Sequence, residues 1–262
     1  MGIDMIRVPL HQLEAFTLGA LGAMGLSARQ ARLVGGALLF SELRFHPGQG
    51  QGIRRLRAYA ERIAAGIIDV AARHEVVKES PALALIDGHN ALGSVTAIEA
   101  MRLAVAKAKV CGVGMAFVRG GTHYGSSAVH AAEAVDAGCI GLAMTNAGAE
   151  MAAWGGASPA VGTNPWAIAA PSGKGFSVSL DIALTTAGKG MMRWLSREGE
   201  RIPTDWALTP DGEETDDPDK AMAGALLGIG RYKGFGLSLM TDVMTGVLTG
   251  GGFGLAPYSD AA

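Results

Sequence analysis

The chain has 262 residues, enough for one large domain or two closely packed ones, and 49% of them are hydrophobic, which is ample for a sizeable core. A formal net charge of −2 gives no general reason to expect a nucleic acid or an anionic membrane as partner. The two cysteines, Cys111 and Cys139, form no motif and argue against a disulfide framework, so the cytoplasm is the default compartment.

The first part of the chain, residues 10–44, is predicted to be helical. Ser27, with Gln30 three residues later, is typical of a capping box that opens a helix. The glycine-rich stretch 48–52 interrupts this pattern, and an amphipathic helix is predicted over residues 53–63. The start of the chain lacks the basic region and long apolar core of a signal peptide.

From residue 82 onward, apolar strands and helices alternate, which indicates an α/β protein whose helices cover a sheet. The apolar stretch up to Gly254 contains Asp242 and many glycines, so a buried helix is expected there rather than a membrane span. No internal repeat or low-complexity linker marks a domain boundary. We predict strands at 82–86, 115–118, 140–145, 167–170 and 177–180, helices at 94–110, 126–135 and 234–248, and an exposed polar excursion at 196–219.

Several common site signatures are weak or missing. The stretch GIGRYKG at 228–234 precedes a helix and includes Lys233, which could face a phosphate, but no clear strand precedes it and no acidic residue is placed for a ribose. The six histidines show neither the metalloprotease pair nor cysteine–histidine spacing, which argues against a metal site. The absence of GxSxG disfavours a hydrolase with a nucleophile elbow.

His123 is the strongest single candidate for chemistry. It lies in GGTHYGSS, after an apolar strand and before a helix, where α/β sheets usually bind ligands, and histidine can pass a proton near neutral pH. Arg55 and Tyr59 are four residues apart and share one helix face, and an arginine fork suits a carboxylate. Alternatively, His123 only caps the helix or packs in a turn, and the other two are an ordinary polar pair on a helix.

Taken in chain order, seven segments resemble the malate/L-lactate dehydrogenase-like family of NAD(P)-dependent oxidoreductases. They cover roughly residues 6 to 254 and are SELRFHPGQGQGIRRLRAY, RGGTHYGSS, GLAMTNAGAEMAAWGG, AVGTNPWAIAAP, SVSLDIA, PTDWALTPDG and GRYKGFGLSLMTDVMTGVL. The resemblance implies hydride transfer between NAD or NADP and a small 2-oxo or 2-hydroxy acid such as malate, lactate or ureidoglycolate. It also implies a homodimer and a non-Rossmann α/β fold with a mixed sheet, helices on its faces and a helical N-terminal region.

The resemblance further implies two regions: a helical, substrate-side region over residues 1–80 and an α/β, cofactor-binding region over residues 81–262. In these, His123 is the candidate acid or base beside the nicotinamide, Arg55 binds the substrate carboxylate, and Tyr59 offers a hydrogen bond. The substrate pocket is implied to include Thr145 and Asn146. The implied cofactor side comprises His123, Gly162, Thr163, Asn164, Pro165, Ser177, Val178, Ser179, Leu180, Asp181, Ile182, Ala183, Tyr232, Lys233 and Gly234, with the Asp181 carboxylate accepting from cofactor hydroxyls.

The chain departs from the family pattern in two places. Gln51 stands where the family often has a histidine assigned as proton donor, two extra residues follow Arg44, and a glutamine amide cannot exchange a proton near neutral pH. Either His123 transfers the proton, His46 takes the vacant place, or the chain reduces the C=N bond of a cyclic imino acid, which can arrive protonated. The chain also ends sooner than family members normally do. A truncated, inactive cofactor-binding remnant and an unrelated α/β module for a small acid are therefore further alternatives.

Overall fold

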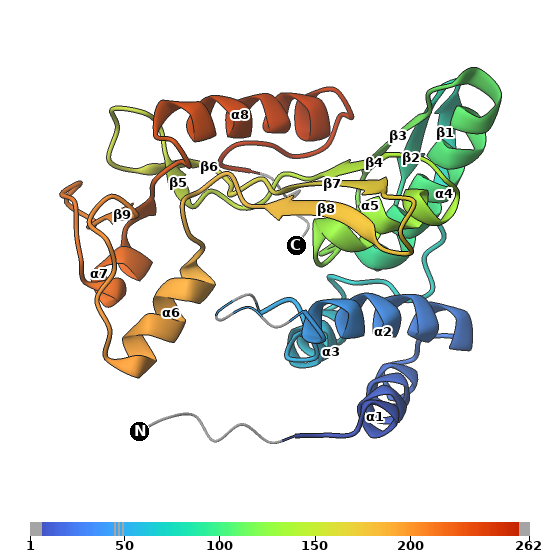
Figure 1. The fold of residues 1–262 in the computed structure, drawn as a ribbon, viewed down its shortest axis with the longest axis horizontal. Helices are drawn as coiled ribbons and strands as arrows, with labels where there is room; N and C mark the ends of the chain where they lie inside the picture. The colour runs from blue at the N-terminus through green and yellow to red at the C-terminus, as the bar shows by residue number, and fades with distance from the viewer. Residues whose placement is uncertain (1–6, 45, 47, 49, 257–262) are drawn as a thin grey trace.

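The computed structural model describes residues 7–44, 46, 48 and 50–256, which form helices and three small sheets (Figure 1). The expected absence of a signal peptide concerns the start of the chain, most of which lies outside these residues. No helix in the described part of the chain is long and apolar enough to cross a membrane. The architecture is mixed α/β, as predicted.

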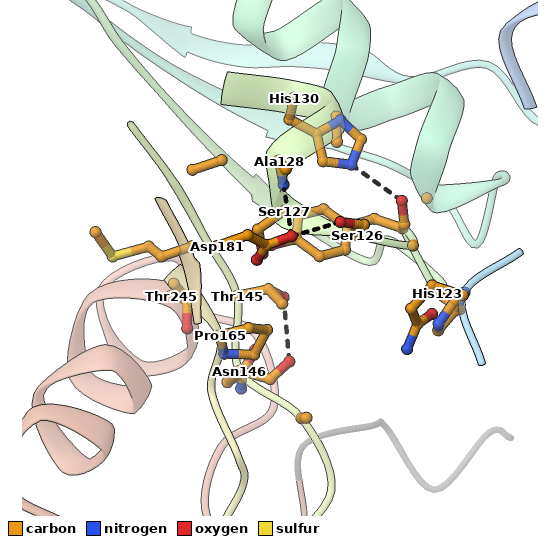
Figure 2. Close-up of a pocket in the computed structure, with 18 of the residues that line it drawn as sticks. His123, Ser126, Ser127, Ala128, His130, Thr145, Asn146, Pro165, Asp181 and Thr245 are labelled. Atoms are coloured by element: carbon orange, nitrogen blue, oxygen red, sulfur yellow. Dashed lines mark hydrogen bonds between the residues drawn. The ribbon is translucent and has the colours of Figure 1, made fainter. Parts of the chain in front are cut away.

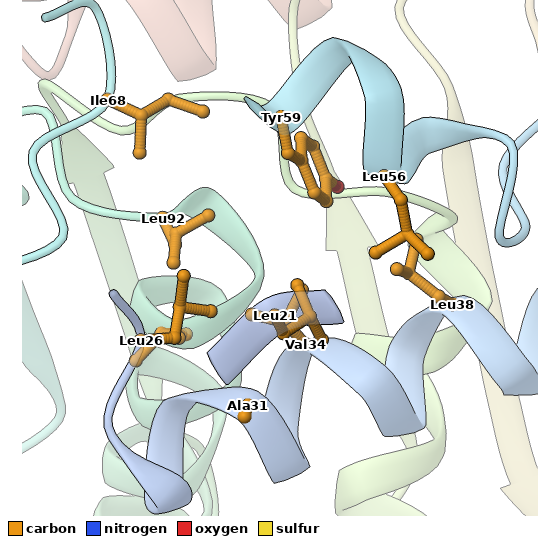
Figure 3. Close-up of a cluster of buried hydrophobic side chains, with 10 residues drawn as sticks. Leu21, Leu26, Ala31, Val34, Leu38, Leu56, Tyr59, Ile68 and Leu92 are labelled. Atoms are coloured by element: carbon orange, nitrogen blue, oxygen red, sulfur yellow. The ribbon is translucent and has the colours of Figure 1, made fainter. Parts of the chain in front are cut away.

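Three N-terminal helices lie together below the sheets in the view of Figure 1: α1 (Leu10–Ala23), α2 (Ala28–Glu42) and α3 (Arg55–Ala64). The predicted capping box is confirmed, because the Ser27 hydroxyl accepts from the backbone N–H of Gln30 while the Gln30 side chain accepts from the backbone N–H of Ser27. The buried faces of these helices meet the start of the next helix in one apolar cluster (Figure 3). Its members include Leu21, Leu26, Ala31, Val34, Leu38, Leu56, Tyr59, Ile68, Leu92 and Val95.

The first sheet has the order β1-β2-β3, with β1 (Glu75–Glu79), β2 (Leu83–Asp87) and β3 (Met115–Arg119). Strands β2 and β3 are parallel and are joined by α4 (Gly93–Cys111), which confirms the predicted strand–helix–strand unit. The exposed strand β1 was not predicted, because its sequence EVVKE lacks a clear apolar alternation.

The second sheet is antiparallel, with the order β4-β7-β8, and it places residues of the candidate site. Helix α5 (Ser127–Asp136) covers one face, where Ala131 of the helix meets Ala167 and Ala169 of the sheet, all fully buried. Small side chains allow the helix to approach the strands closely. The register sets Asp181 opposite Ala167, and therefore on the face that α5 covers. The strands are β4 (Gly141–Met144), β7 (Trp166–Pro171) and β8 (Ser177–Ile182).

The third sheet corrects one expectation. The segment 196–219 was predicted to be a polar, exposed excursion, and this is wrong for Ile202, Ala207 and Leu208, which are buried. Ile202 and Ala207 pack in one apolar cluster with Met192, a contact between distant residues that no local periodicity reveals. The elements here are β5 (Met151–Ala152), β6 (Pro159–Val161), β9 (Ala207–Leu208) and β10 (Ala225–Leu226), in the order β6-β5-β10-β9, with α6 (Lys189–Glu198) and α7 (Pro218–Ala223).

The last helix, α8 (Tyr232–Asp242), continues into a π-helical turn (Val243–Val247), which confirms the predicted helix but not its expected burial. Ser238 and Thr241 are fully buried, whereas Leu239 and Met240 are exposed. The buried hydroxyls are paired: Ser238 donates to the carbonyl of Gly162 at 2.8 Å, and Thr241 accepts from the indole of Trp166 at 2.7 Å. The inner face of the helix therefore combines these paired hydroxyls with Phe235, which packs in an apolar cluster, while Leu239 and Met240 stay exposed.

Candidate active site

A large open cleft of about 2200 Å³ is lined by the N-terminal helices, the β3–α5 loop, the second sheet and α6. Most residues predicted for the site lie on its wall, and part of the wall is drawn in Figure 2. Since they come from segments more than 100 residues apart, the fold itself assembles them. The predicted residues on the wall are His46, Gln51, Arg55, His123, Thr145, Asn146, Thr163, Pro165, Ser177, Ser179, Asp181 and Ala183.

Tyr59 and His123 are in direct contact. The Tyr59 hydroxyl lies 3.0 Å from Nδ1 of His123, although the two residues are 64 positions apart. Tyr59 is 1% exposed, and burial raises the pKa of its phenol, so the hydroxyl keeps its proton at neutral pH. This buried neighbour on α3 fixes the orientation of the imidazole.

The imidazole of His123 is neutral at physiological pH. Its pKa is lowered from 6.5 to about 3, first by burial and then by the positive charges of Arg55 and Arg62, with a smaller effect from His130. The charges of both arginines also partly oppose the rise that burial causes in the pKa of Tyr59, which shows that they lie near this pair. A neutral imidazole has a lone pair for a proton, but a pKa this far below neutrality makes it a weak base until the nearby positive charges are neutralised.

The loop that carries His123 is held by its neighbour Tyr124. The carbonyl of Tyr124 accepts from Nε2 of His130 at 3.0 Å and from the hydroxyl of Ser94 at 3.1 Å. The Tyr124 ring stacks on the imidazole of His130 with centroids 4.5 Å apart. Ser94 is also a hydrogen-bond partner of Tyr59, and this contact partly opposes the rise that burial causes in the pKa of that phenol. The chain of contacts thus runs from His123 to Tyr59, to Ser94 and back to the loop.

Helix α4 meets the same loop at Gly93. A Cβ atom added there would lie 2.0 Å from the carbonyl oxygen of Thr122, which is far inside contact distance. The Gly93 backbone N–H is bonded to the Thr122 hydroxyl at 3.1 Å. Only glycine therefore allows the helix to begin this close to the loop before His123.

Asp181 lies at the N-terminus of α5. One oxygen of its carboxylate accepts from the Ser126 hydroxyl at 2.5 Å and from the Ala128 N–H at 3.3 Å, as the dashed lines in Figure 2 show. A negative charge is favourable at a helix N-terminus. The Asp181 side chain is nevertheless exposed on the cleft wall, so the helix positions a carboxylate that a ligand can reach.

Alternate residues of β8 line the cleft. Ser177, Ser179 and Asp181 are on the wall, whereas Val178 and Leu180, predicted with them, point to the opposite face of the sheet. Ile182 shares that opposite face and packs beneath it in an apolar cluster. The period of two along a strand accounts for this division.

Two asparagines of the predicted site bind backbone. Asn146 donates to the carbonyl of Gly252 at 2.7 Å. Asn164, fully buried with φ of +35°, accepts from the N–H of Ala147 at 2.9 Å and donates to the carbonyl of Ser238 at 2.9 Å. The 162–165 turn is therefore tied to α8, and Asn164 has no exposed surface to offer to a ligand.

The residues predicted at the start of α8 are not on the described wall of the cleft. Tyr232 is 59% exposed and packs edge-on against Trp154, and Lys233 is also exposed. Gly234 is buried, where a Cβ atom would lie 2.4 Å from the N of Ile229. The fold thus separates this turn from the residues around His123.

The loop with Gln51 and His46 reaches across the cleft. Gly48 packs against Gly190 of α6, and a Cβ atom on Gly190 would lie 2.0 Å from the carbonyl oxygen of Gly48. The carbonyl of Gly50 accepts from Nε of Arg55 at 2.9 Å. The loop therefore connects α3 with α6 beside the candidate site.

The cleft wall is strongly cationic in a chain of net charge −2, and its acidic residues are Glu150 and Asp181. Such a wall suits ligands with phosphate and carboxylate groups, including a nicotinamide dinucleotide. Among the described residues, no three His, Cys, Asp or Glu side chains are grouped closely enough to hold a metal ion. The cations are Arg44, Arg54, Arg55, Arg62, Arg119, Lys189, Arg193 and Arg197, of which sequence reasoning identified only Arg55 as a site residue.

Residues 8–261 match the family model described as malate/L-lactate dehydrogenase. A malate dehydrogenase of Pyrococcus abyssi is 36% identical over 256 residues, which are 95% of this chain and 70% of the relative. A malate/(S)-sulfolactate dehydrogenase of Methanothermus fervidus is 33% identical over 89% of this chain and 68% of its own length. The crystal structure of malate dehydrogenase from Entamoeba histolytica superposes with a TM-score of 0.90 at 29% identity, covering 95% of this chain and 73% of that one.

The names of more distant relatives include both cofactors and a C=N substrate. They are a (2R)-3-sulfolactate dehydrogenase (NADP+), a ureidoglycolate dehydrogenase (NAD+) and a Δ1-pyrroline-2-carboxylate reductase, at 31%, 32% and 29% identity. The matches therefore extend over nearly the whole chain, and each of these relatives is named as a dehydrogenase or a reductase.

Proposed function

The chain belongs to the malate/L-lactate dehydrogenase family, as its sequence segments predict, and we propose that the cleft around His123 is where it transfers a hydride between NAD or NADP and a small 2-oxo or 2-hydroxy acid. The observation that carries this assignment is the 3.0 Å contact between Tyr59 and His123, with Arg55 close enough for its positive charge to act on both groups. A proton-transfer group and a carboxylate-binding group thus share one wall of the cleft.

Arg55 binds the substrate carboxylate through its planar fork, which holds the 2-carbon near His123. When bound, the nicotinamide ring supplies or accepts the hydride at that carbon. His123 exchanges the proton of the substrate oxygen: the neutral imidazole takes it when a hydroxy acid is oxidised, and the protonated imidazole returns it when an oxo acid is reduced.

The contact with Tyr59 leaves one ring nitrogen of His123 for the substrate. The Tyr59 hydroxyl lies 3.0 Å from Nδ1 of His123 and so occupies that nitrogen. In the tautomer that serves as a base, Nδ1–H donates to the phenol oxygen, which leaves the lone pair of Nε2 for the substrate proton. The buried phenol therefore orients the imidazole as a base.

On the cofactor side, one carboxylate oxygen of Asp181 is bound by Ser126 and the start of α5, and the carboxylate accepts from cofactor hydroxyls through its other oxygen. Ser177 and Ser179 continue the same exposed row along β8. Near the substrate, Gln51 donates a hydrogen bond without exchanging a proton, and His46 is the alternative proton donor. The arginines and Lys189 offer positive charge to the pyrophosphate.

A cyclic imino acid is a second candidate substrate. Gln51 cannot donate a proton, and the pKa of His123 is lowered to about 3, so the free chain holds no ready proton donor among these two residues. A protonated C=N bond needs none. Comparing the reduction of a cyclic imino acid with that of a 2-oxo acid in one absorbance assay decides between the candidates.

The assignment of His123 is tested by NAD(P)H absorbance with a panel of 2-oxo, 2-hydroxy and cyclic imino acids. Replacing His123 with Ala is expected to lower turnover of the best oxo or hydroxy acid by roughly 10²–10⁴, the usual effect of a positioned acid or base. His11→Ala, on the exposed face of α1, is the matched control. A fully active His123→Ala variant would remove this residue from the mechanism.

We further propose a cytoplasmic homodimer with a non-Rossmann fold, divided into a substrate-side region over residues 1–80 and a cofactor-side region from residue 81 onward. The exposed apolar side chains of Leu239 and Met240 on α8 and of Val178 and Leu180 on β8 support an interface between copies. Light scattering on the purified chain measures the mass, and a monomer at micromolar concentration would contradict the dimer.

A further inference from the structure

Helix α3 presents a second arginine to the cleft. Arg55, Ala58 and Arg62 lie at spacings of three and four residues, and all three line the cleft wall. Arg57 lies on another face, with its side chain 88% exposed and paired with Glu61 at 2.8 Å. The same helix therefore carries one arginine neutralised on the surface and two directed to the site.

Arg62 is half-buried, and among the described residues its side chain has no carboxylate within ion-pair distance and makes no hydrogen bond. It nevertheless lies close enough to the pair that its positive charge adds to the lowering of the pKa of His123 by burial and partly offsets the rise that burial causes in the pKa of Tyr59. The acidic side chains of the cleft wall do not neutralise it: Asp181 is bound to Ser126, and neither Asp181 nor Glu150 reaches Arg62. A partly desolvated guanidinium without a partner attracts an anion.

The distance between the two arginines limits the length of an acid that can contact both of them. Seven residues of helix separate the Cα atoms of Arg55 and Arg62 by about 10 Å, and two long side chains can shorten this distance from both ends. Tyr59 lies between them on the helix and holds His123. A three- or four-carbon acid can thus reach both guanidinium groups while its 2-carbon faces the imidazole.

Resting on the proposed function, we infer that Arg62 binds a second anionic group of the substrate, so that the cleft prefers dianionic 2-oxo or 2-hydroxy acids, dicarboxylates or carboxylate–sulfonates, to monoanionic ones. Arg55 binds the carboxylate next to the reacting carbon, and Arg62 binds the far end. Arg62 is then a specificity residue, because a monoanion leaves it unpaired.

The test compares oxaloacetate with pyruvate in NAD(P)H oxidation by the wild type, Arg62→Ala and Arg62→Lys. Loss of one charge-assisted hydrogen bond is expected to lower kcat/KM for oxaloacetate roughly tenfold to hundredfold in Arg62→Ala, and to change it less than threefold for pyruvate. Arg62→Lys, which keeps the charge without the fork, is expected to fall between. Arg57→Ala is the matched control on the same helix and is expected to leave both substrates unaffected.

Equal losses for both acids, or no loss for either, would overturn the role of Arg62. A binding measurement with malonate separates this outcome from failure of the proposed function. Malonate is a dicarboxylate that is not reduced, so its binding can be measured without any turnover. Malonate is expected to raise the unfolding temperature of the wild type and of Arg57→Ala more than acetate does, and Arg62→Ala is expected to lose that difference. If no acid is turned over but malonate binding still depends on Arg62, the proposed dianion site is supported and the proposed activity is contradicted.

Discussion

Replacing His130 with Gln is expected to make the free energy of unfolding fall less steeply as the pH drops below neutrality. His130 is 1% exposed, and burial lowers the pKa of its imidazole from 6.5 to about 4. The unfolded chain therefore binds more protons than the folded chain between these pH values, and stability falls as the pH drops through that window. The loss reaches about 2 kcal/mol at pH 5 and about 3 kcal/mol below pH 4, at 1.36 kcal/mol per pKa unit.

Urea unfolding followed by circular dichroism at pH 7, 6 and 5 measures this effect. The amide introduced by His130→Gln keeps an N–H donor for the Tyr124 carbonyl, which now accepts from His130 at 3.0 Å, so stability at pH 7 is expected to change by less than the pH effect itself. His123 titrates in the same direction and remains in both proteins, so the difference between them isolates position 130. His11→Gln, on the exposed face of α1, is the control. Parallel curves for wild type and His130→Gln would refute the reasoning.

Two further substitutions test the substrate site and its loop. Arg55→Ala is expected to raise KM for the acid roughly tenfold to hundredfold with a smaller change in kcat, because a carboxylate loses its charge-assisted partner; unchanged steady-state kinetics would contradict the role. Gly93→Ala is expected to lower the unfolding temperature by several degrees and cost roughly 1–3 kcal/mol, since its Cβ would meet the Thr122 carbonyl at 2.0 Å. A thermal scan that matches the wild type would show that helix α4 can move away without cost.

Strongly patterned elements could be predicted from sequence, and weakly patterned ones could not. The capping box at Ser27 and the apolar strands β2 and β3 each have a sequence pattern that can be recognised within a few residues. Strands β9 and β10 are two residues long and are defined by pairing with each other across 17 positions, so no local signal marks them. The fully buried Met192 of α6 likewise depends on partners in α7 and β10.

The candidate site shows the same limit. His123 and the pair of Arg55 and Tyr59 stand in recognisable segments, and the structure places them together. Ser126 was missed because its function depends on a carboxylate 55 positions away, and a serine before a helix suggests only a cap. Arg62 had a signal that was available: it lies three residues after Tyr59, on the helix face already chosen for substrate.

The charges around His123 couple substrate binding to proton uptake. In the free chain, Arg55 and Arg62 help to lower the pKa of the imidazole to about 3, so an anion that neutralises them must raise that pKa. At pH 5 the second carboxyl of malonate also titrates, and it contributes equally to binding by the wild type and by His123→Ala. The wild type is therefore expected to take up a fraction of a proton more than His123→Ala does, which calorimetry in two buffers of different ionisation enthalpy measures, and equal uptake by the two proteins would contradict the coupling. By this coupling a bound acid, hydroxy or oxo, brings the pKa of His123 closer to neutrality, where the imidazole can both take up and return a proton.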